Sequence, residues 1–473
     1  MNEADFDLIV VGAGVAGLSA ALSALEYAKS VEKEINVLIV EKGSANNWGG
    51  SSRYTQAYMR LKDESNISDS VLEDSKKFSN GMNDEHYIEK LSSEIPMVLE
   101  WVKAHGVEIE PIPTAWLTSS LPRFGPKGGG LAVIETLMSH VKSLGGQIAF
   151  ETTVWNFSYD DSGNINGVFV RDRNGKSLKI KSSIVILASG GFSGNKEMLL
   201  RYIGDNAIFL KSHMGSNDFY HTGECLSLAV NAGAASSGQW NSFHSAINDP
   251  RSDTVDPSIY IYPYGILVNL KGERFVDEGR DTIDEQYDIT TKEFIFKQPL
   301  NKAFFITDEN LLKIQGYQRS IATGIDPIVT SSLSELAQKI GINPEKLNKT
   351  VQEFNDAIQP GVFDPYKLDG KRTRGLKIEK TNWAMKIEKP PFICYPVECR
   401  VTITFGGIKT SLEGKVLSTD NVPIGNLFAA GEITGFYHGK YLGSTSFLRG
   451  MVFGKRAGET AAKEIISRFS NGN

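Results

Sequence analysis

The feature that most constrains this chain is a glycine-rich turn near its start, placed between two apolar runs. Residues 6–11 form the first run, and a small-residue helix and a second apolar run, residues 37–40, follow the turn. Glu41 ends the second run. Strand, glycine turn, helix, strand and acidic residue in this order are the fingerprint of a βαβ unit that binds a dinucleotide. The turn itself reads Gly12-Ala13-Gly14-Val15-Ala16-Gly17.

Each part of this fingerprint has a physical role. Gly12 permits the tight turn, Gly14 lets the backbone approach a pyrophosphate, and Gly17 lets the helix and strand pack closely. The helix N-terminus attracts the anion, and Glu41 accepts ribose hydroxyls. The residues that we expect to bind the cofactor in this unit are Gly12, Ala13, Gly14, Val15, Ala16, Gly17, Glu41 and Lys42.

A second part of the same site lies near the other end of the chain. Residues 422–430 form a short apolar strand that enters a turn at Gly431 and Glu432, and a long helix begins at about Ser446. NAD enzymes of the Rossmann type seldom need such a segment, whereas flavoproteins that wrap FAD use one to close over the ribityl chain and the flavin. The sequence therefore predicts FAD as the cofactor.

Two further glycine-rich turns suit a close approach of the backbone to a cofactor. One follows the first βαβ unit, and the other follows a buried strand at residues 184–187, after a β-meander that begins near residue 147. Glycine there permits conformations and contacts that a side chain would prevent. From these regions we predict contacts to the cofactor by Gly49, Gly50, Ser51, Ser52, Val154, Ala188, Ser189, Gly190 and Asn195.

Composition and charge exclude several functions. The 473 residues carry a net charge of −6 without a basic run, which argues against nucleic acid or an anionic membrane as a partner. No apolar stretch approaches the roughly 18 residues of a membrane span, and the acidic N-terminus does not fit a signal peptide. The three cysteines have no spacing typical of a metal or iron–sulfur site. We expect a cytoplasmic enzyme without a bound metal.

The chain reads as an α/β dinucleotide domain that is interrupted by a cap. We assign residues 1–243 and 386–473 to the dinucleotide domain, and residues 244–385, where scattered strands and amphipathic helices occur, to an inserted α+β cap. Within the cap, Asn343 and Pro344 predict the start of a helix. The final helix carries small residues at four-residue spacing, for which we expect tight packing on the sheet: Gly450, Gly454, Gly458 and Ala462.

Several motifs, taken in order, resemble the fumarate reductase/succinate dehydrogenase flavoprotein superfamily. Besides the glycine turns, they are residues 272–278 (Gly-Glu-Arg-Phe-Val-Asp-Glu), 405–408 (Phe-Gly-Gly-Ile) and 430–432 (Ala-Gly-Glu). Residues 52–55, 262–266, 401–407 and 436–438 resemble the FAD-dependent tricarballylate dehydrogenase-like branch in particular. The resemblance implies a Rossmann-like FAD domain of the GR2 type with an inserted cap, and a substrate held between the cap and the flavin.

The resemblance also implies a reaction. Enzymes of this superfamily oxidise or reduce a carbon–carbon bond next to a carboxylate, exchanging a hydride with flavin N5 while a protein group moves the proton. His244 lies where the superfamily places a histidine that binds the substrate carboxylate. Arg280 lies close to the position of the arginine that acts as the acid in fumarate reductases; the alternative for Arg280 is a salt bridge to Asp281 or Glu278.

Two departures from the pattern make fumarate a poor substrate. Thr402 replaces a second carboxylate-binding histidine, and Tyr441 replaces an arginine that is expected in the loop 439–443. Arg400 and Lys440 are candidates to restore the positive charge, with a solvated surface position as the alternative. The catalytic candidates are therefore Arg280, His244, Tyr441 and Arg400.

Further cofactor contacts follow from the resemblance. A family segment near the flavin corresponds to residues 222–224, and residues 444–447 are expected to present amides to the flavin pyrimidine edge. Members with covalent FAD use a histidine near the second glycine-rich loop, and residues 1–85 contain none, so we expect non-covalent FAD. These segments add Thr222, Gly223, Glu224, Gly431, Glu432, Ser444, Ser446 and Phe447 to the predicted FAD site.

These observations predict an FAD-dependent oxidoreductase that dehydrogenates, or reversibly reduces, a small polycarboxylic acid. A quinone or a separate redox protein would accept the electrons, because no second dinucleotide fingerprint is present. The alternatives are a ketosteroid Δ1-dehydrogenase-like desaturase, in which Tyr441 serves in proton chemistry, and a fumarate reductase-like enoate reductase. A flavin-binding sensor without turnover is a further alternative.

Overall fold

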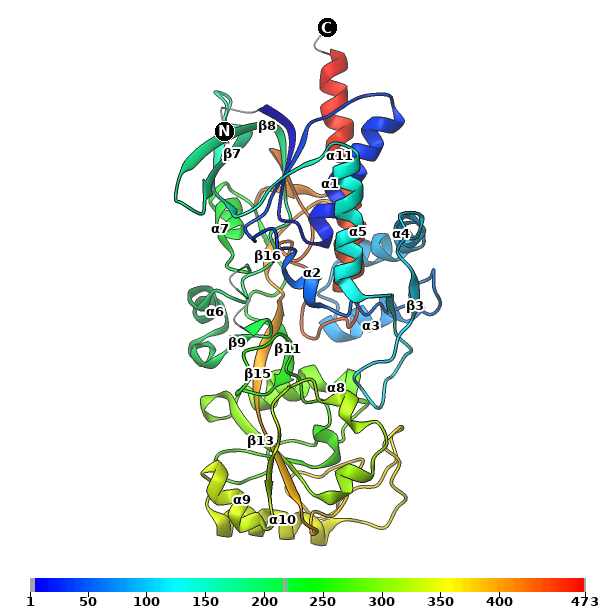
Figure 1. Cartoon of the computed structure of the whole chain (residues 1–473), viewed down its shortest axis with the longest axis vertical. Helices are drawn as coiled ribbons and strands as arrows, with labels where there is room; N and C mark the ends of the chain where they lie inside the picture. Colours follow the sequence, from blue (N-terminus) through cyan, green and yellow to red (C-terminus); the bar gives the residue numbers. More distant parts are fainter. Residues whose placement is uncertain (1–4, 216–217, 219, 472–473) are drawn as a thin grey trace.

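The computed structural model describes residues 5–215, 218 and 220–471. Most of the N-terminal segment on which the signal-peptide argument rests, residues 1–4, lies outside the described residues. Figure 1 shows two stacked parts, with both ends of the chain in the upper one. The upper part is the dinucleotide domain and the lower part is the cap.

A mostly parallel sheet forms the centre of the dinucleotide domain. Its main order is β17-β18-β8-β1-β2-β5, and β7 joins β6 to β8 at the side. The first βαβ unit places β1 between β2 and β8, with Val10 opposite Ile39 and Ile186. The strands are β1 (Asp5–Val11), β2 (Val37–Val40), β5 (Gln147–Ala149), β6 (Thr152–Tyr159), β7 (Ile165–Asp172), β8 (Ser177–Leu187), β17 (Lys415–Leu417) and β18 (Pro423–Ala429).

The final helix packs on another helix more than on the sheet. The helices α1 (Val15–Ser30), α5 (Gly129–Ser143) and α11 (Ser446–Asn471) lie side by side (Figure 1). A side chain at Gly454 would overlap the carbonyl of Ala16, and one at Gly450 would come within 2.9 Å of Val15. The expected packing of this glycine stripe on the sheet is therefore corrected to packing on α1, where the lack of side chains lets two helix backbones meet.

The cap is built on a second sheet, whose main order is β11-β15-β13-β12. Its long strand, β15 (Phe392–Thr404), runs from the lower end of the molecule to the junction between the two parts (Figure 1). The predicted return to the first domain at residue 386 is therefore too early, because β15 pairs with cap strands along its length. The other strands are β9 (Lys211–Ser212), β11 (Phe243–Asn248), β12 (Ile266–Val268), β13 (Lys302–Thr307) and β14 (Ile328–Thr330).

The helices of the cap include α8 (Ile283–Ile289), α9 (Leu333–Ile340) and α10 (Pro344–Ala357). The predicted start of α10 is confirmed, because the Asn343 side chain accepts a hydrogen bond from the backbone N–H of Lys346. The remaining helices and strands are α2 (Gly50–Tyr54), α3 (Val71–Ser79), α4 (Glu85–Ala104), β3 (Ile109–Pro111), β4 (Phe124–Pro126), α6 (Lys196–Ile203), α7 (Glu224–Asn231), β10 (Ser236–Ser237) and β16 (Gly407–Ile408).

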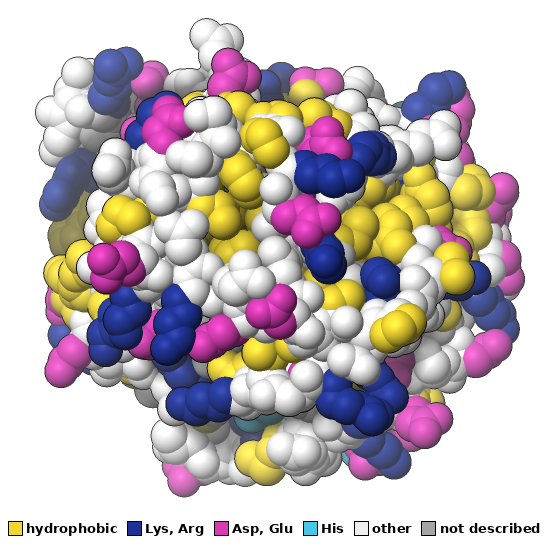
Figure 2. Space-filling view, turned by 90° about the horizontal axis from the view of Figure 1, so that it is seen from below, with side chains coloured by type: hydrophobic (Ala, Val, Ile, Leu, Met, Phe, Trp, Pro, Cys, Tyr) yellow, Lys and Arg dark blue, Asp and Glu magenta, His cyan; other side chains and the backbone are white. Residues whose placement is uncertain are grey.

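The surface of the cap end mixes charges of both signs with apolar side chains (Figure 2). Within the part of the chain that the structure describes, no helix has the length and apolar character that crossing a membrane requires.

Candidate functional site

A continuous cavity of about 690 Å³ runs from the ends of the parallel strands to the inner side of the cap. At one end it begins where β1, β2 and β8 finish, at Val11, Val40 and Ala188. The carboxyl ends of parallel strands are where open α/β sheets bind ligands. At the other end the cavity reaches His244 and Tyr287 in the cap. It therefore has a cofactor part and a substrate part.

The cofactor part is shaped by the absence of side chains. Gly12 has a φ of 106°, and a Cβ there would lie 2.9 Å from the carbonyl carbon of Ala188. Gly14 is the N-cap of α1 and offers no capping side chain, so the first amide of the helix, that of Val15, donates to Ser52 Oγ at 3.0 Å. The start of α1 lines the cavity, and a helix N-terminus favours an anion. These residues fit the pyrophosphate of a dinucleotide.

Glu41 ties the first turn to the end of β2. Its Oε2 accepts a hydrogen bond from the amide of Ala13, and its Oε1 accepts one from the amide of Gly43, both at 2.7 Å. Burial raises the pKa of this carboxyl, although the two amides act in the opposite direction. Glu41 still lines the cavity, so the acid at the end of the fingerprint faces the cofactor part.

Most of the residues predicted to bind the cofactor line this cavity. Four do not. Gly17 packs against the Gly12 carbonyl, Asn195 caps α6, and Thr222 and Gly223 precede α7. Those that line the cavity are Gly12, Ala13, Gly14, Val15, Ala16, Glu41, Lys42, Gly49, Gly50, Ser51, Ser52, Val154, Ala188, Ser189, Gly190, Glu224, Gly431, Glu432, Ser444, Ser446 and Phe447.

Sequence reasoning missed His221, a buried cation in the cofactor part. Its Nδ1 lies 2.6 Å from Asp218 Oδ1, and its Nε2 lies 3.2 Å from Ser51 Oγ. Burial alone would lower the pKa of His221, but Asp218, together with Glu432 and Glu41, raises it to about 9. The imidazole lies outside every motif in the sequence, so only the fold places it beside the glycine turns.

The start of α11 forms another side of the cavity. The buried Arg449 donates hydrogen bonds from Nη2 to the carbonyls of Gly431 and Thr434, which fixes the Gly431 turn to the helix. Tyr441 Oη accepts hydrogen bonds from the amides of Ser446 and Thr445. The N-terminus of this long helix therefore points its amides and partial positive charge toward the cavity.

The substrate part of the cavity is largely aromatic. Trp116 lies at its centre, with ring centroids 5.3 Å from Tyr58, 6.1 Å from Tyr260 and 5.7 Å from Tyr287. The sequence did not single out these four residues, because they come from separate loops and helices. Rings in such contact form flat apolar walls.

A chain of close polar contacts leads out of the substrate part, with a hydrogen bond between Tyr287 and His244 and an ion-pair distance between His244 and Asp288. The Tyr287 hydroxyl lies 2.9 Å from His244 Nε2, and His244 Nδ1 lies 3.1 Å from Asp288 Oδ1. His244 and Tyr287 line the cavity, whereas Asp288 lies behind them. On the other side of His244 its ring centroid is 4.3 Å from that of Tyr441. Two of the predicted catalytic residues, His244 and Tyr441, are thus brought together.

The other two predicted catalytic residues do not line the cavity. Arg280 lies over the ring of Phe294 at 4.6 Å. Arg400 is fully buried, donates to Glu398 Oε1 at 2.8 Å, and also donates to the carbonyls of Asp249 and Ser252. The internal hydrogen bonds of Arg400 contradict its assignment to the substrate. The catalytic role of Arg280 stays a prediction.

Positive charge near the substrate part comes from elsewhere. Lys440 is paired with Glu285 at 2.5 Å and does not line the cavity. Arg319 does line it, and its Nη2 lies 3.4 Å from the Trp116 carbonyl. Among the described residues Arg319 has no carboxylate within salt-bridge distance. Thr402 also lines the cavity, and its hydroxyl donates to the carbonyl of His244.

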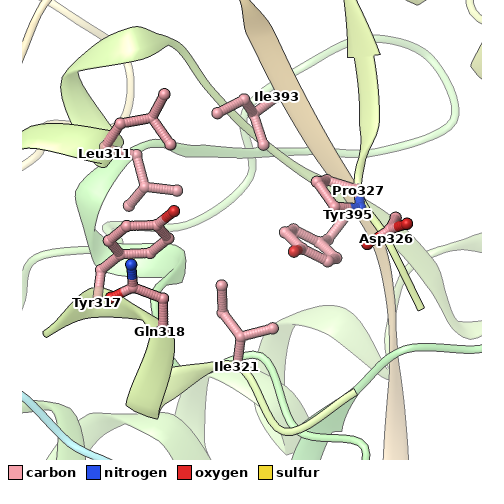
Figure 3. Close-up of a pocket in the computed structure, with 9 residues that line it drawn as sticks. Leu311, Tyr317, Gln318, Ile321, Asp326, Pro327, Ile393 and Tyr395 are labelled. Atoms are coloured by element: carbon pink, nitrogen blue, oxygen red, sulfur yellow. The ribbon is translucent and has the colours of Figure 1, made fainter. Parts of the chain in front are cut away.

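A smaller cavity of about 320 Å³ lies in the cap. Leu311 and Tyr317 lie opposite Pro327 and Tyr395 across it (Figure 3). The turn at Tyr317–Ser320 separates the two cavities, because Tyr317 faces the smaller one and Arg319 faces the larger one.

The architecture and the glycine cradle agree with the comparison to known proteins. A family model described as an FAD binding domain matches residues 7–448. The chain belongs to this FAD-binding family. NADH:acrylate oxidoreductase of Vibrio harveyi is 27% identical over 97% of the chain, and vinyl phenol reductase of Lactiplantibacillus plantarum is 26% identical over 97%. The open conformation of a flavocytochrome c3 fumarate reductase is 25% identical, with a TM-score of 0.78 over 98% of the chain.

These relatives identify the chain as an FAD-dependent oxidoreductase of the fumarate reductase superfamily, which confirms the predicted superfamily and cofactor. The relatives differ in length. The chain spans 50% of the acrylate oxidoreductase, 96% of the vinyl phenol reductase and 79% of the flavocytochrome. The electron-transfer route of a longer relative therefore does not follow from the match.

Proposed function

We propose that the protein exchanges a hydride and a proton across a carbon–carbon bond of a flat, largely apolar substrate. That bond is conjugated to an electron-withdrawing group, such as a carbonyl, a carboxylate or a phenolic ring. The observation that carries the proposal is the aromatic wall around the substrate part, formed by Tyr58, Trp116, Tyr260 and Tyr287. Ligand sites lined by apolar rings with a few placed polar groups favour planar molecules of this kind.

FAD, when bound in the cradle, supplies the two-electron exchange. The chain supplies the polar groups that orient the substrate. Tyr441 Oη is held by the Ser446 amide at 3.0 Å, and this amide polarises the phenol. We propose that, with substrate bound, the Tyr441 hydroxyl donates to the oxygen of the electron-withdrawing group instead of to Ser446 Oγ and stabilises the enolate-like charge that develops there.

Two of the three named relatives support this substrate class, whereas the third is named as a fumarate reductase, and fumarate is a dicarboxylate. One acts on a vinyl phenol and another on acrylate, and both compounds carry a carbon–carbon double bond next to an activating group. The relative named for vinyl phenol covers nearly the same length as this chain. A di- or tricarboxylate would need several cationic side chains to bind its carboxylates. Neither Arg280 nor Arg400 lines the cavity.

A small polycarboxylate of the tricarballylate type is the second candidate. The observation that favours it is the Arg319 guanidinium in the cavity wall. On this alternative an Arg319→Gln variant loses activity toward di- and tricarboxylates and keeps its activity toward neutral enones. In the first proposal, the aromatic wall determines which substrates the enzyme prefers.

We propose that the electron acceptor, which is the electron donor when the reaction runs as a reduction, is a separate redox protein or a quinone. The support is the absence of a second dinucleotide fingerprint from the sequence. We also propose that FAD is held without a covalent bond, and that the protein works in the reducing cytoplasm, where its three free cysteines are stable. Anaerobic NADH is expected to leave the flavin oxidised, and acid precipitation is expected to release all of the FAD. Rapid bleaching by NADH would contradict the first expectation.

The test of the substrate class is steady-state turnover of the holoenzyme with a reduced viologen dye. The panel contains 4-vinylphenol, cinnamate, acrylate, a 3-keto-4-ene steroid, fumarate and aconitate. Trp116→Ala is expected to lower kcat/KM for the ring-bearing compounds by about 10- to 100-fold, because it removes the aromatic wall. Trp155→Ala is the matched control, since Trp155 is 39% exposed on β6 and does not line the cavity. A preference for fumarate or aconitate over all ring-bearing compounds would overturn the proposal.

A further inference from the structure

We infer that Tyr287 carries the proton of this reaction, that His244 relays it, and that Asp288 orients the relay. The inference rests on the proposed function, because it names the proton carrier for that reaction. It replaces Arg280, whose side chain does not line the cavity.

The geometry is that of a hydroxyl activated by a histidine and a carboxylate. Tyr287 Oη lies 2.9 Å from His244 Nε2, and His244 Nδ1 lies 3.1 Å from Asp288 Oδ1. Such a chain lets a hydroxyl gain or lose a proton while the carboxylate holds the imidazole in one tautomer. Tyr287 and His244 both line the substrate part, and the proposal places the Tyr287 hydroxyl against the substrate.

Asp288 is fixed in the charged form. Its Oδ1 accepts hydrogen bonds from the amide and the hydroxyl of Ser245, at 2.8 and 2.9 Å. Burial would raise the pKa of Asp288, but Lys292, His244 and the Ser245 amide hold it well below its usual range. A carboxylate in this position favours a proton on His244 Nδ1 and leaves Nε2 free to accept the Tyr287 proton.

Tyr287 is held in place and kept protonated at rest. Its ring stacks on Trp116, with an interplanar angle of 22°, and meets Tyr260 edge-on at 5.2 Å. Burial, together with the nearby Tyr260 and Asp288, raises the pKa of Tyr287 well above its ordinary value. The neutral phenol is therefore the resting form, and it ionises only while the proton passes along the relay.

The neighbouring phenol, Tyr441, makes different hydrogen bonds from Tyr287. Tyr441 also lies beside His244, but its hydroxyl donates to Ser446 Oγ and accepts from the Ser446 amide. No hydrogen bond joins Tyr441 to His244 in the described part of the chain. Tyr441 therefore suits charge stabilisation, and Tyr287 suits proton transfer.

The proton step balances in both directions. In the oxidation, the C–H bond next to the electron-withdrawing group breaks and its proton passes to Tyr287 Oη. The phenolic proton of Tyr287 moves to His244 Nε2, and the resulting imidazolium is paired with Asp288. The electron pair of the broken bond forms the C=C bond, and a hydride leaves the neighbouring carbon, for which FAD bound in the cradle would be the acceptor. In the reduction each transfer is reversed.

The test compares Tyr287→Phe with Tyr262→Phe in the FAD-loaded enzyme. Tyr262 is a matched control because it is fully buried in the same domain and does not line the cavity. We expect Tyr287→Phe to lower kcat by about 10²- to 10⁴-fold, with KM changed by less than about threefold. Solvent deuterium incorporation at the carbon next to the electron-withdrawing group should fall by the same factor. A kcat for Tyr287→Phe within about threefold of the control would overturn the inference.

A second readout is independent of turnover. The ¹⁵N spectrum of histidine-labelled holoenzyme, assigned with His244→Gln, is expected to show His244 protonated at Nδ1 and bare at Nε2. Asp288→Asn should shift this tautomer toward Nε2. A wild-type ring protonated at Nε2 would overturn the relay. If the wild-type enzyme turns over no compound of the panel, the proposed function fails, and the tautomer alone then decides the relay.

Discussion

The hydroxyl of Tyr441 accepts a hydrogen bond from the backbone amide of Ser446, at 3.0 Å. This contact brings a side chain of the substrate part to the first residue of α11, at a point where His244 lies against the same tyrosine ring. The final helix therefore serves both parts of the cavity. Its first turn faces the cofactor part, and its amides polarise a phenol beside the substrate part.

Replacement of Tyr441 by Phe tests that role. The variant removes a donor for developing negative charge and leaves the amides of Thr445 and Ser446 without this acceptor. We expect kcat to fall by about 10²-fold, the range found for the loss of one oxyanion donor. The measurement is single-turnover oxidation of the reduced flavin. Unchanged kcat with only a raised KM would show that Tyr441 binds substrate without stabilising the charge.

His221 predicts a dependence of stability on pH. Its pKa is raised to about 9 in the folded protein, from 6.5 in the unfolded chain. The folded state therefore binds the extra proton more tightly, and this stabilisation is complete below pH 6.5 and is lost as the pH rises to about 9. We expect the holoenzyme to lose about 1–3 kcal/mol of unfolding free energy across this window.

The control for this prediction is His221→Gln. The variant keeps a polar side chain beside Ser51 and removes the titrating group. Its stability between these pH values should change less than that of the wild-type protein. If the free energy of unfolding, measured with urea, changes equally with pH in the two proteins, another group causes the dependence.

The contact between α1 and α11 makes Gly454 sensitive to substitution. A Cβ at Gly454 would overlap the Ala16 carbonyl, and Ala16 follows the turn that lines the cofactor part. Gly454→Ala is expected to cost about 1–3 kcal/mol and to weaken FAD binding, because overpacking displaces the start of α1. Gly324→Ala is the control, since a Cβ at Gly324 meets nothing within 4 Å. If the two variants have the same free energy of unfolding and the same affinity for FAD, the packing account is contradicted.

Arg280 is expected to be dispensable for turnover. It stacks on Phe294 at 4.6 Å and does not line the cavity. Arg280→Met should keep kcat/KM within about threefold and lose about 1 kcal/mol of stability with the cation–π contact. If the variant retains FAD but loses several orders of magnitude in kcat, Arg280 acts as the acid that the family pattern implies.

The sequence predicted the cofactor part far better than the substrate part, for a physical reason. The glycine turns follow buried strands directly, so local sequence indicates both their conformation and their place at the sheet edge. Trp116, Tyr260 and Tyr287 belong to three separate segments, and only the tertiary fold brings them together. Arg400 shows the complementary error, because a place in the sequence locates a residue along the chain but not the direction of its side chain.

The end of the cap was also misplaced by the sequence pattern. Residues 392–404 fall in the dinucleotide domain by the predicted boundary at residue 386. In the structure their pairing with β11 and β13 assigns them to the cap. The sheet that a strand joins depends on partner strands far along the chain. The residue pattern within the strand does not identify these partners.

The most direct test of the central claim is the rate at which substrates reoxidise the reduced flavin under anaerobic stopped flow. At equal concentrations, 4-vinylphenol or cinnamate is expected to react at least about tenfold faster than fumarate or aconitate, because the substrate part offers aromatic walls and few cations. Faster reaction with fumarate or aconitate, or no reaction with any ring-bearing compound, would contradict the account.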